Sequence, residues 1–219
     1  MSYSVKELFY TLQGEGAQTG RASVFCRFTG CNLWSGLEKD RHKTVCPFCD
    51  TDFVGTDGEG GGKFANAQVL AERIIQTWTN TNNGGTNHPS RIKPYVVFTG
   101  GEPLLQLDEA LIHHLHEAGF EVAVETNGTI IAPQGIDWLC VSPKQGDKLL
   151  QRSGNELKLL FPLKNMPPAE FEALDFQHFF LQAIDEGDDI NHLPDVIQYC
   201  LDHPQWRISL QTHKLLGLK

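Results

Sequence analysis

Three cysteines near the N-terminus have a spacing that could serve a metal centre. Cys46 and Cys49 stand in CPFC, and Cys31 stands in TGCN, with the fourteen residues 32–45 between it and Cys46. Thiolates bind zinc and iron-sulfur clusters, and three of them are one ligand short of the closed tetrahedral set of a structural zinc. The fourth ligand is therefore either a nearby side chain or a second molecule.

A histidine in the intervening stretch could supply the missing ligand. Cys31, His42, Cys46 and Cys49 would form a Cys3His set, which is a proper donor set for zinc. However, His42 lies in a charged run, and its spacing from Cys31 is irregular for a small zinc site. A structural zinc would also leave the polar motifs at the predicted strand ends without a role. A zinc-stabilised binding module without catalysis stays open as one hypothesis.

The alternative is a four-iron cluster, which keeps one iron open when only three thiolates hold it. A molecule with an amine and a carboxylate can chelate that iron, as the methionine end of S-adenosylmethionine does in radical enzymes. The neighbouring residues favour this hypothesis. Phe48 can offer an aromatic face to adenine, and TGGEP places two glycines where the backbone must approach a ligand closely. Glu102 of that motif could accept a hydrogen bond from the amino group.

The scaffold for these side chains is predicted by alternating strand-like and helix-like segments. Strands are predicted at residues 22–30, 95–100, 120–128, 137–144, 156–161, 178–185 and 207–216, and helices at residues 66–78, 107–119, 167–174 and 193–203. A Gly/Asn-rich connector is expected at residues 80–91. Runs such as YVVF and FFL lack polar alternation, as expected for parallel strands covered on both faces. The pattern predicts an α/β fold, layered or barrel-like, in one domain.

Polar motifs follow the predicted strands at the point where each strand ends. They are TGCN, TGGEP, ETNG, SPK and QAID, in chain order. The loops that leave the carboxyl ends of parallel strands build the functional site in such folds. We therefore expect these five motifs to meet in space.

Composition excludes several classes of protein. The chain has 219 residues, 40% of them hydrophobic, and a net charge of −9, which argues against binding of nucleic acid through its phosphates. We expect no membrane span and no export signal, and hence a soluble cytoplasmic protein. Six cysteines in such a chain indicate metal or redox chemistry rather than disulfides. The charged run EKDRHK, residues 38–43, is either a solvated loop or a docking patch.

The remaining cysteines and a group of histidines fit structural positions. Cys26, Cys140 and Cys200 lie in apolar contexts and are expected to be small core residues. His113, His114 and His116 share a predicted helix at spacings that do not pair two imidazoles at i, i+4, so they are expected to face solvent.

Over nearly its whole length the sequence resembles the radical S-adenosylmethionine superfamily, and within it the 7-carboxy-7-deazaguanine synthases of queuosine biosynthesis. The motifs that carry the resemblance are FYTLQGEGAQTGRASVFCRFTGCNLW, CPFCDTDF, FTGGEPLLQ, VETNGT, VSPK, FFLQAID and LQTHKLLG. One departure is clear, because the superfamily usually has three residues between its first two cysteines and this chain has fourteen. The resemblance implies an incomplete (β/α) barrel of about six parallel strands in a single domain, residues 1–219.

The resemblance also implies an activity. The family converts 6-carboxy-5,6,7,8-tetrahydropterin to 7-carboxy-7-deazaguanine by a radical ring contraction that expels ammonia. It implies a 4Fe-4S cluster at Cys31, Cys46 and Cys49, S-adenosylmethionine used catalytically, and Mg2+ at Thr51, with Asp50 as a rival oxygen ligand.

Binding residues carry over by motif position. For S-adenosylmethionine they are Phe48, Cys49, Asp50, Gly101, Glu102, Ser142, Pro143, Lys144, Gln182, Ala183, Ile184 and Asp185. For the pterin substrate they are Leu12, Gln13, Gly14, Glu15, Arg27, Thr99 and His213. Arg27 suits the substrate carboxylate, its structural alternative being a salt bridge at a strand end, and Glu15 suits the polar edge of the pterin ring.

The nearest enzymatic rival is a glycyl-radical activase, which would share the cluster, S-adenosylmethionine and TGGEP. Such an activase acts on a protein backbone and would need neither the N-terminal substrate motif nor Arg27. The resemblance further implies a homodimer and a small electron donor such as flavodoxin or ferredoxin.

Overall fold

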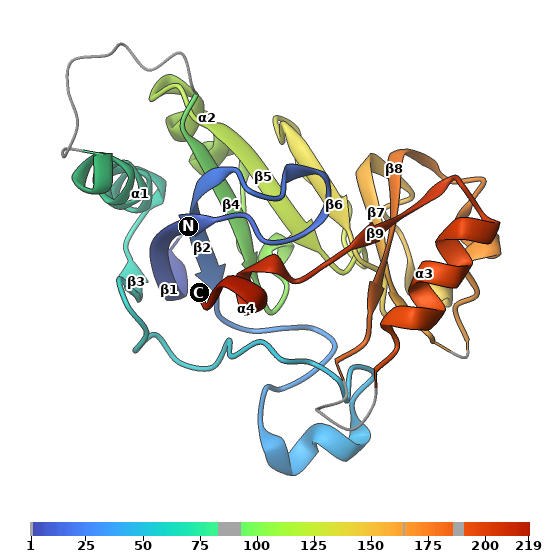
Figure 1. Cartoon of the computed structure of the whole chain (residues 1–219). Coiled ribbons are helices and arrows are strands. Elements are labelled where there is room, and N and C mark those ends of the chain that lie inside the picture. Colours follow the sequence, from blue (N-terminus) through green and yellow to red (C-terminus); the bar gives the residue numbers. More distant parts are fainter. Residues whose placement is uncertain (1, 83–92, 164, 186–190) are drawn as a thin grey trace.

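Nine strands form one open sheet that positions the polar motifs. The computed structural model describes residues 2–82, 93–163, 165–185 and 191–219. Within these residues the strand order is β3-β1-β2-β4-β5-β6-β7-β8-β9 (Figure 1). The strands are β1 Tyr3–Leu12, β2 Ala22–Phe28, β3 Gly62–Phe64, β4 Tyr95–Gly100, β5 Glu121–Thr126, β6 Trp138–Val141, β7 Ser153–Phe161, β8 Asp175–Ala183 and β9 Trp206–Ser209. Because β3 and β9 form the two edges, the sheet is a partial barrel rather than a closed one.

Seven of the strands form the parallel part of the sheet. Strands β2 and β4 to β9 run parallel to their neighbours, whereas β1 pairs antiparallel with both β2 and β3. The predicted parallel α/β sheet is therefore confirmed. The sequence pattern misses β1 and β3. Lys6 and Glu7 interrupt the apolar run of β1, and β3 is three residues long, so neither gives a clear strand signal.

Two predicted elements differ in the structure. The strand predicted at residues 207–216 ends at Ser209 and is followed by helix α4, Thr212–Leu216. The chain leaves the sheet there because Thr212 donates hydrogen bonds from its amide and from Oγ1 to the Gly14 carbonyl, both at 2.9 Å. The helix predicted at residues 167–174 is a single 3-10 turn, Pro168–Phe171. Pro167 precedes this turn, Pro168 is its first residue, and β8 begins at Asp175, so the segment is too short for an α-helix of several turns.

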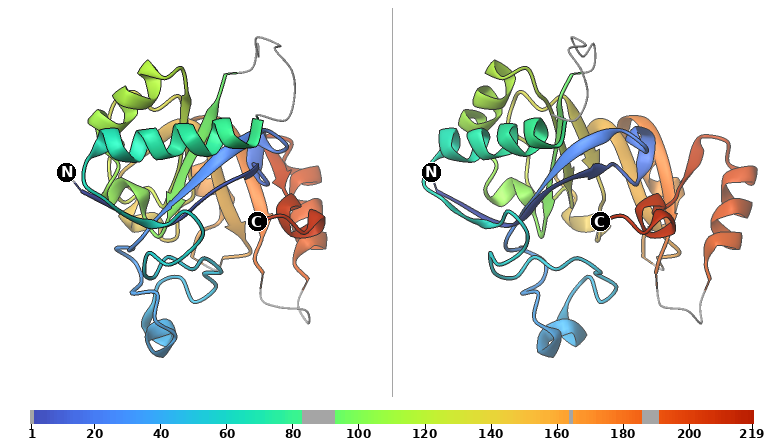
Figure 2. Two further views of the ribbon diagram at one scale, coloured as in Figure 1. Left: turned by 90° about the vertical axis from the view of Figure 1, so that its left-hand side faces the viewer. Right: turned by 60° about the vertical axis from the view of Figure 1, so that its left-hand side comes forward.

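The other predicted helices are confirmed, and they cover one face of the sheet. They are α1 Ala67–Asn82, α2 Glu109–Glu117 and α3 Leu193–Asp202. Figure 2 shows α1 and α2 packed together on the outer face. Leu70 of α1 and Leu111 of α2 are fully buried in a core that includes Val96 and Phe98 of β4. Residues 83–91 of the predicted connector lie outside the described residues.

The opposite face of the sheet carries polar side chains. Successive strand residues point to opposite faces, so Thr99 faces away from the core that contains Phe98. The same alternation places one polar residue from each of five strands on the inner side. These residues are Arg27, Thr99, Glu125, Lys158 and Gln182. The inner face thus carries polar side chains near the carboxyl ends of the strands, next to a small buried apolar cluster of Tyr95, Val97 and Ala123.

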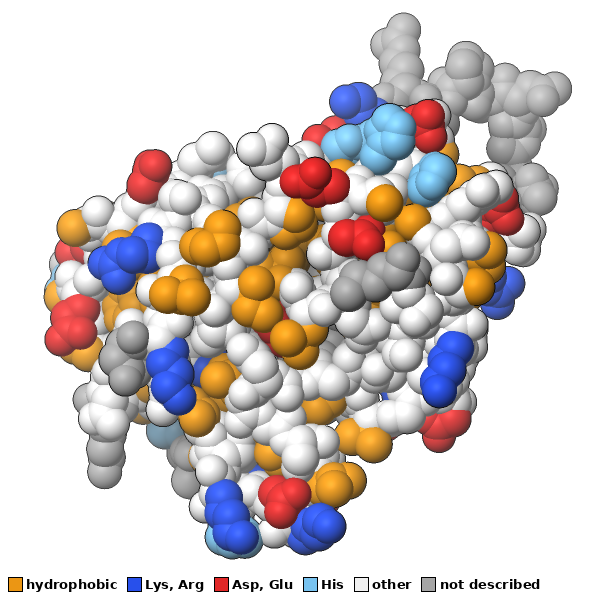
Figure 3. Space-filling view, turned by 180° about the vertical axis from the view of Figure 1, so that it is seen from behind, with side chains coloured by type: hydrophobic (Ala, Val, Ile, Leu, Met, Phe, Trp, Pro, Cys, Tyr) orange, Lys and Arg blue, Asp and Glu red, His pale blue; other side chains and the backbone are white. Residues whose placement is uncertain are grey.

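The predictions that Cys26, Cys140 and Cys200 belong to the core and that the three histidines of α2 face solvent are confirmed. Cys26 and Cys140 are buried, and Cys200 packs partly buried against the core. The α2 histidines form a group at the surface (Figure 3), where His113 and His114 lie near Glu117 and His116 bonds Asp137 at 2.9 Å. Among the described residues, none of the helices combines the length and the apolar character needed to cross a membrane.

Candidate active site

A cavity of about 410 Å³ opens on the inner face, at the carboxyl ends of the parallel strands. Its walls come from the loops after β2, β4, β5, β6 and β8, from the start of the chain and from α4. Most residues that the sequence predicts for the site line it. They are Leu12, Gln13, Gly14, Glu15, Arg27, Cys31, Cys46, Phe48, Cys49, Asp50, Thr51, Thr99, Gly101, Ser142, Lys144, Gln182, Ala183, Ile184, Asp185 and His213. Glu102 and Pro143 do not line the cavity.

The three cysteines share this cavity. Cys31 follows β2, and Cys46 and Cys49 follow a 3-10 helix, η2, Glu38–Lys43. Burial raises the pKa of the Cys46 thiol to about 11, although the nearby Lys144 charge lowers it. His42 is exposed and does not line the cavity. Among the described residues, no three His, Cys, Asp or Glu side chains converge on a single ion position.

This donor set fits a cluster with an open iron better than a structural zinc. Three thiols face one solvent-connected space, and the histidine that would complete a zinc site points elsewhere. A structural zinc needs four protein ligands around one ion, whereas a four-iron cluster held by three thiolates needs room for a further ligand. The cavity beside the cysteines provides that room.

The glycines of TGGEP bring two protein loops together. A Cβ on Gly101 would lie 2.0 Å from the Gly30 carbonyl oxygen and 2.8 Å from Cys31 Cβ. A Cβ on Gly100, whose φ is +130°, would lie 2.2 Å from the Phe28 carbonyl oxygen. The sequence predicts that these glycines make way for a ligand. In the structure they let the loop after β4 lie against the loop that carries Cys31.

Glu102 is a buried connector of loops. Its carboxylate accepts hydrogen bonds from Leu104 N at 3.0 Å, Thr126 Oγ1 at 2.7 Å and Asn127 N at 2.8 Å. Burial raises the pKa of Glu102, and the two backbone amides oppose that rise. The predicted contact of Glu102 with a bound amine has no counterpart in the cavity lining. Glu102 instead ties TGGEP to ETNG.

Thr51 stands between two carboxylates that are already engaged. Lys214 contacts Asp50 Oδ2 at 2.8 Å, and Lys6 contacts Asp52 Oδ2 at 2.8 Å. The Thr51 hydroxyl makes no hydrogen bond within the described residues, and it lines the cavity. Of the three neighbouring oxygen donors, the Thr51 hydroxyl is therefore the one without a competing partner.

Arg27 has features of both roles that were predicted as alternatives, a salt bridge at a strand end and a position at the substrate cavity. Its Nε donates to Glu7 Oε1 at 2.8 Å, which is the salt bridge between neighbouring strands, and it also lines the cavity. Within the described residues its two terminal nitrogens make no hydrogen bond. The guanidinium is therefore anchored by one edge and can still bind an anion with the other.

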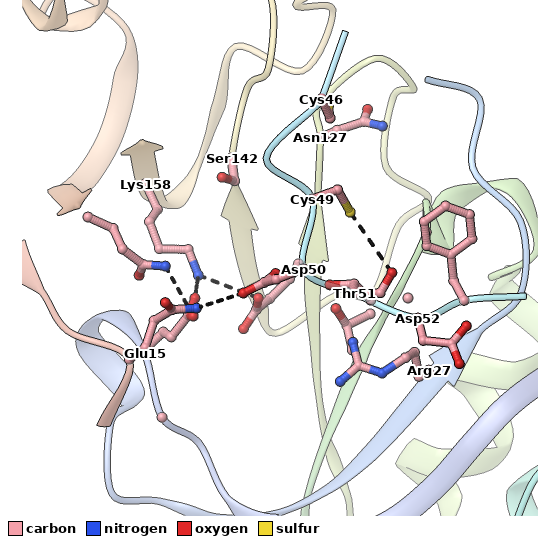
Figure 4. A pocket seen from close by; sticks show the side chains of 18 of the residues that line it. Glu15, Arg27, Cys46, Cys49, Asp50, Thr51, Asp52, Asn127, Ser142 and Lys158 are labelled. Atoms are coloured by element: carbon pink, nitrogen blue, oxygen red, sulfur yellow. Dashed lines mark hydrogen bonds and ion pairs between the residues drawn. The ribbon is translucent and has the colours of Figure 1, made fainter. Parts of the chain in front are cut away.

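A buried lysine on β7 is a site residue that the motifs do not reveal. Lys158 is 4% exposed, and its ammonium contacts Glu15 Oε2 and lies 3.4 Å from Glu125 Oε2. Gln182 Nε2 donates to the other Glu15 oxygen at 3.1 Å, and Gln13 Nε2 donates to Glu125 Oε1 at 2.8 Å. Figure 4 shows Glu15 and Lys158 pointing toward one another. One feature of the sequence could have indicated Lys158. In NELKLL, Glu156 and Lys158 alternate with leucines, so both charges lie on one face of a buried strand, and such charges need a polar cavity.

The electrostatics of this group follow from its burial. Burial alone would raise the pKa of Glu15, but the Lys158 charge lowers it to about 2. Burial opposes the charged form of Lys158, and the Glu125 and Glu15 carboxylates raise its pKa well above the ordinary range. The cavity therefore holds an ionised carboxylate and a charged lysine in direct contact.

The C-terminal QTHK segment closes one side of the cavity. A Cβ on Gly14 would lie 2.2 Å from His213 Nδ1, so only glycine lets the imidazole lie against this loop. Lys214 bonds Asp50 at 2.8 Å and Asp185 at 2.7 Å. Helix α4 thereby connects the substrate motif, the cysteine loop and the end of β8.

Comparison with known proteins gives close relatives over the whole chain. The sequence is 60% identical over 218 residues to the 7-carboxy-7-deazaguanine synthase of Bordetella pertussis and 60% identical over 218 residues to that of Caulobacter vibrioides, covering 100% of both chains each time. It is 52% identical over 218 residues to that of Burkholderia multivorans, again over 100% of both chains. No protein-family model matches the chain.

A solved structure with the same fold is QueE from Escherichia coli. It matches with a TM-score of 0.60 at 23% identity, covering 96% of this chain and 94% of the other. This likeness supports the partial barrel as the fold of the chain.

Proposed function

This chain belongs to the family of 7-carboxy-7-deazaguanine synthases, and from that premise we propose that its cavity converts 6-carboxy-5,6,7,8-tetrahydropterin to 7-carboxy-7-deazaguanine with loss of ammonia. It is a radical S-adenosylmethionine enzyme of queuosine biosynthesis. The observation that carries the proposal is the shared cavity, in which three cysteines lie with Arg27 and Glu15. Its volume of about 410 Å³ is within the usual range for a small-molecule site.

Cys31, Cys46 and Cys49 would hold a 4Fe-4S cluster, and S-adenosylmethionine would bind beside it. When bound, the cluster supplies the electron that cleaves S-adenosylmethionine and so starts the radical chemistry. Phe48 would offer its ring to the adenine, and Lys144 and Asp185 present a cation and an anion to the polar groups. Further contacts are proposed at Asp50, Gly101, Ser142, Gln182, Ala183 and Ile184, all of which line the cavity.

Thr51 would bind Mg2+. A hard cation takes oxygen ligands, so the Thr51 hydroxyl and a substrate carboxylate suit it, with water in the other positions. The free hydroxyl of Thr51 supports this assignment. Asp50 is the weaker candidate, because Lys214 already neutralises its carboxylate.

The substrate would be held at both of its polar ends. The two unbonded terminal nitrogens of Arg27 can receive the carboxylate as a bidentate pair. Glu15, kept ionised by Lys158, accepts hydrogen bonds from the N–H groups of the pterin, assisted by the backbone of residues 12–14 and by Thr99. His213, which lies against Gly14, excludes water from that side.

The remaining features of the proposal concern the whole molecule. One sheet runs through the described residues, which supports a single domain over residues 1–219. We propose a homodimer in the cytoplasm, without nucleic acid as a partner, that receives its electron from a small flavodoxin or ferredoxin.

An anaerobic turnover assay tests the function. The cluster is reconstituted and reduced, the pterin, S-adenosylmethionine and Mg2+ are added, and the 7-deazaguanine product is followed by chromatography. We expect more product than S-adenosylmethionine consumed. Cleavage of S-adenosylmethionine without product would remove the assigned substrate and keep the cofactor chemistry.

Two rivals have separate tests. Metal analysis of anaerobically purified protein excludes the zinc-stabilised module if about four irons and little zinc are bound. His42→Ala should leave the metal content unchanged, since His42 does not line the cavity. A glycyl-radical activase would cleave S-adenosylmethionine with a protein substrate and would be indifferent to Arg27→Ala.

A further inference from the structure

The fourteen residues between Cys31 and Cys46 form a lobe below the sheet, and nothing described so far explains them. The lobe contains the 3-10 helix η2, Glu38–Lys43, and lies at the bottom of the molecule in Figures 1 and 2. Basic side chains are exposed at its tip (Figure 3). Lys39 and Lys43 are exposed, and their side chains make no hydrogen bond or ion pair within the described residues, but Arg41, between them, points back into the cysteine loop.

Arg41 connects to both halves of CPFC. Its Nη1 donates hydrogen bonds to the Pro47 carbonyl at 2.8 Å and to the Cys49 carbonyl at 2.9 Å. The residues after η2 have no regular secondary structure until β3 at Gly62. The turn itself has one internal backbone bond, Cys49 N to Cys46 O at 3.1 Å. One guanidinium nitrogen therefore adds two hydrogen bonds to a turn that otherwise has few.

The lobe holds the guanidinium in this orientation from two other sides. Glu38 binds Nε at 2.7 Å and Nη2 at 2.5 Å in a bidentate pair. The Arg41 Cζ lies 4.4 Å from the centroid of the Trp34 ring, and Trp34 is itself buried. A planar, always charged group with five donors suits this set of contacts, and a lysine ammonium does not reproduce it.

We propose that Arg41 is a positioning residue for the metal centre: the lobe exists to place its guanidinium on the Pro47 and Cys49 carbonyls, so that Cys46 and Cys49 are presented together to the cavity. In the charged run EKDRHK, Arg41 then faces the cysteine loop and holds it, whereas the other side of the run faces solvent. The proposal rests on the proposed function in one respect, that the group bound by the three cysteines is a cluster. Outer-shell groups that orient metal ligands commonly contribute about 10- to 100-fold to metal binding.

The first test needs no cofactor. In cluster-free protein under reducing, anaerobic conditions, the alkylation rates of individual cysteines by iodoacetamide are measured by peptide mass spectrometry. Arg41→Ala should speed alkylation of Cys46, which is buried in the intact turn, roughly 10-fold, because the turn loses two charge-assisted hydrogen bonds. Cys31, which Arg41 does not contact, is the internal reference. Lys43→Ala removes a charge from η2, which also carries Arg41, and should change none of the three rates.

The second test uses the reconstituted holoenzyme. Arg41→Ala should retain about 10-fold less cluster than wild type after gel filtration and should change the electron paramagnetic resonance signal of the reduced cluster. Arg41→Lys keeps the charge and should recover little of either property, because the paired geometry is lost. Lys43→Ala is again the control.

The outcomes separate the two proposals. Wild-type protein that takes up no iron would refute the cluster, and with it the proposed function. Wild-type protein that loads normally, with Arg41→Ala showing unchanged alkylation rates, cluster retention and spectrum, would overturn the role of Arg41 alone. Full recovery by Arg41→Lys would show that Arg41 acts through its charge alone, and it would overturn the proposed role of its paired hydrogen bonds.

Discussion

The Lys158 ammonium contacts the Glu15 carboxylate across 143 residues of sequence, and the two side chains are only 5% and 14% exposed. Glu15 belongs to the N-terminal GEG segment, which precedes β2, and Lys158 belongs to the seventh strand. The pair forms where the start of the chain crosses the inner face of the sheet. It places the charge of Glu15 at the site proposed for the pterin.

Replacing Lys158 by Met should destabilise the protein. Glu15 and Glu125 would then lie in a buried site without their cation, and removal of one partner of a buried pair typically costs about 3–5 kcal/mol. Urea unfolding at pH 7 measures the change, with the exposed Lys63→Met as the matched control. A loss below about 1 kcal/mol, the usual value for exposed pairs, would show that the pair is hydrated in solution.

The cost of Lys158→Met should depend on pH. The pKa of Glu15 is lowered to about 2 from the ordinary 4.5, so its pairing stabilises the protein fully above pH 4.5 and loses that effect as the pH falls toward 2. In the variant, burial without Lys158 raises the pKa of Glu15, and a protonated Glu15 needs no cation. The difference in unfolding free energy between wild type and variant should therefore be largest at neutral pH and shrink below pH 4.5. A difference that is constant from pH 7 to pH 3 would contradict the assignment.

Arg27→Ala should lower pterin turnover more than uncoupled cleavage of S-adenosylmethionine. A bidentate bond to a carboxylate is a charged hydrogen bond of about 1.5–3 kcal/mol, which corresponds to roughly 10- to 100-fold in kcat/KM. Product formation and 5′-deoxyadenosine formation are measured side by side. Arg73→Ala, an exposed arginine on α1, serves as the control. Equal loss of both activities would place Arg27 in the fold rather than in substrate binding.

Glu102→Gln should act on stability. The amide can still accept the hydrogen bonds from Leu104 and Thr126, but its NH2 would face the Asn127 amide, which is also a donor. An unsatisfied buried donor typically costs about 1–3 kcal/mol. Urea unfolding of Glu102→Gln is compared with the exposed Glu170→Gln. If only the affinity for S-adenosylmethionine changes, Glu102 binds the cofactor directly.

Lys214→Met should affect cofactor binding more than folding. Asp50 and Asp185 are each 49% exposed in their side chains, so their pairing with Lys214 contributes at most about 1 kcal/mol to stability. Without Lys214 the two carboxylates lose their common anchor, and we expect the Kd of S-adenosylmethionine for the cluster-loaded protein to rise by about fivefold, the equivalent of 1 kcal/mol. Calorimetric titration measures it, with Lys63→Met as the reference. An unchanged Kd would assign Lys214 to the surface alone.

The sequence by itself indicated the ligand types and the order of the seven parallel strands and of helices α1 to α3. These features are local patterns, which can be recognised in the sequence alone. They are the cysteine triplet, the polar motifs after the strands and the apolar runs of the parallel sheet. They predict the chemistry of the cavity and most of its lining. Both glycines of TGGEP line the cavity, so their close approach to a ligand stays a prediction, and only the structure reveals that they also let the loop after β4 pack against the cysteine loop.

Only the tertiary structure decided which side chains pair with one another. In the structure Lys158 pairs with Glu15, and Lys214 pairs with Asp50 and Asp185. Thr212 bonds the Gly14 carbonyl. Glu102 bonds the loop after β5 and does not line the cavity. Lys214 and Asp50 are separated by 164 residues, and no periodicity relates them. Such contacts depend on the register of the strands and on where the chain leaves the sheet. The physical reason is that a charged side chain pairs with whichever opposite charge the completed fold brings within reach, and the need for a partner is strongest where the charge is buried, as it is for Lys158.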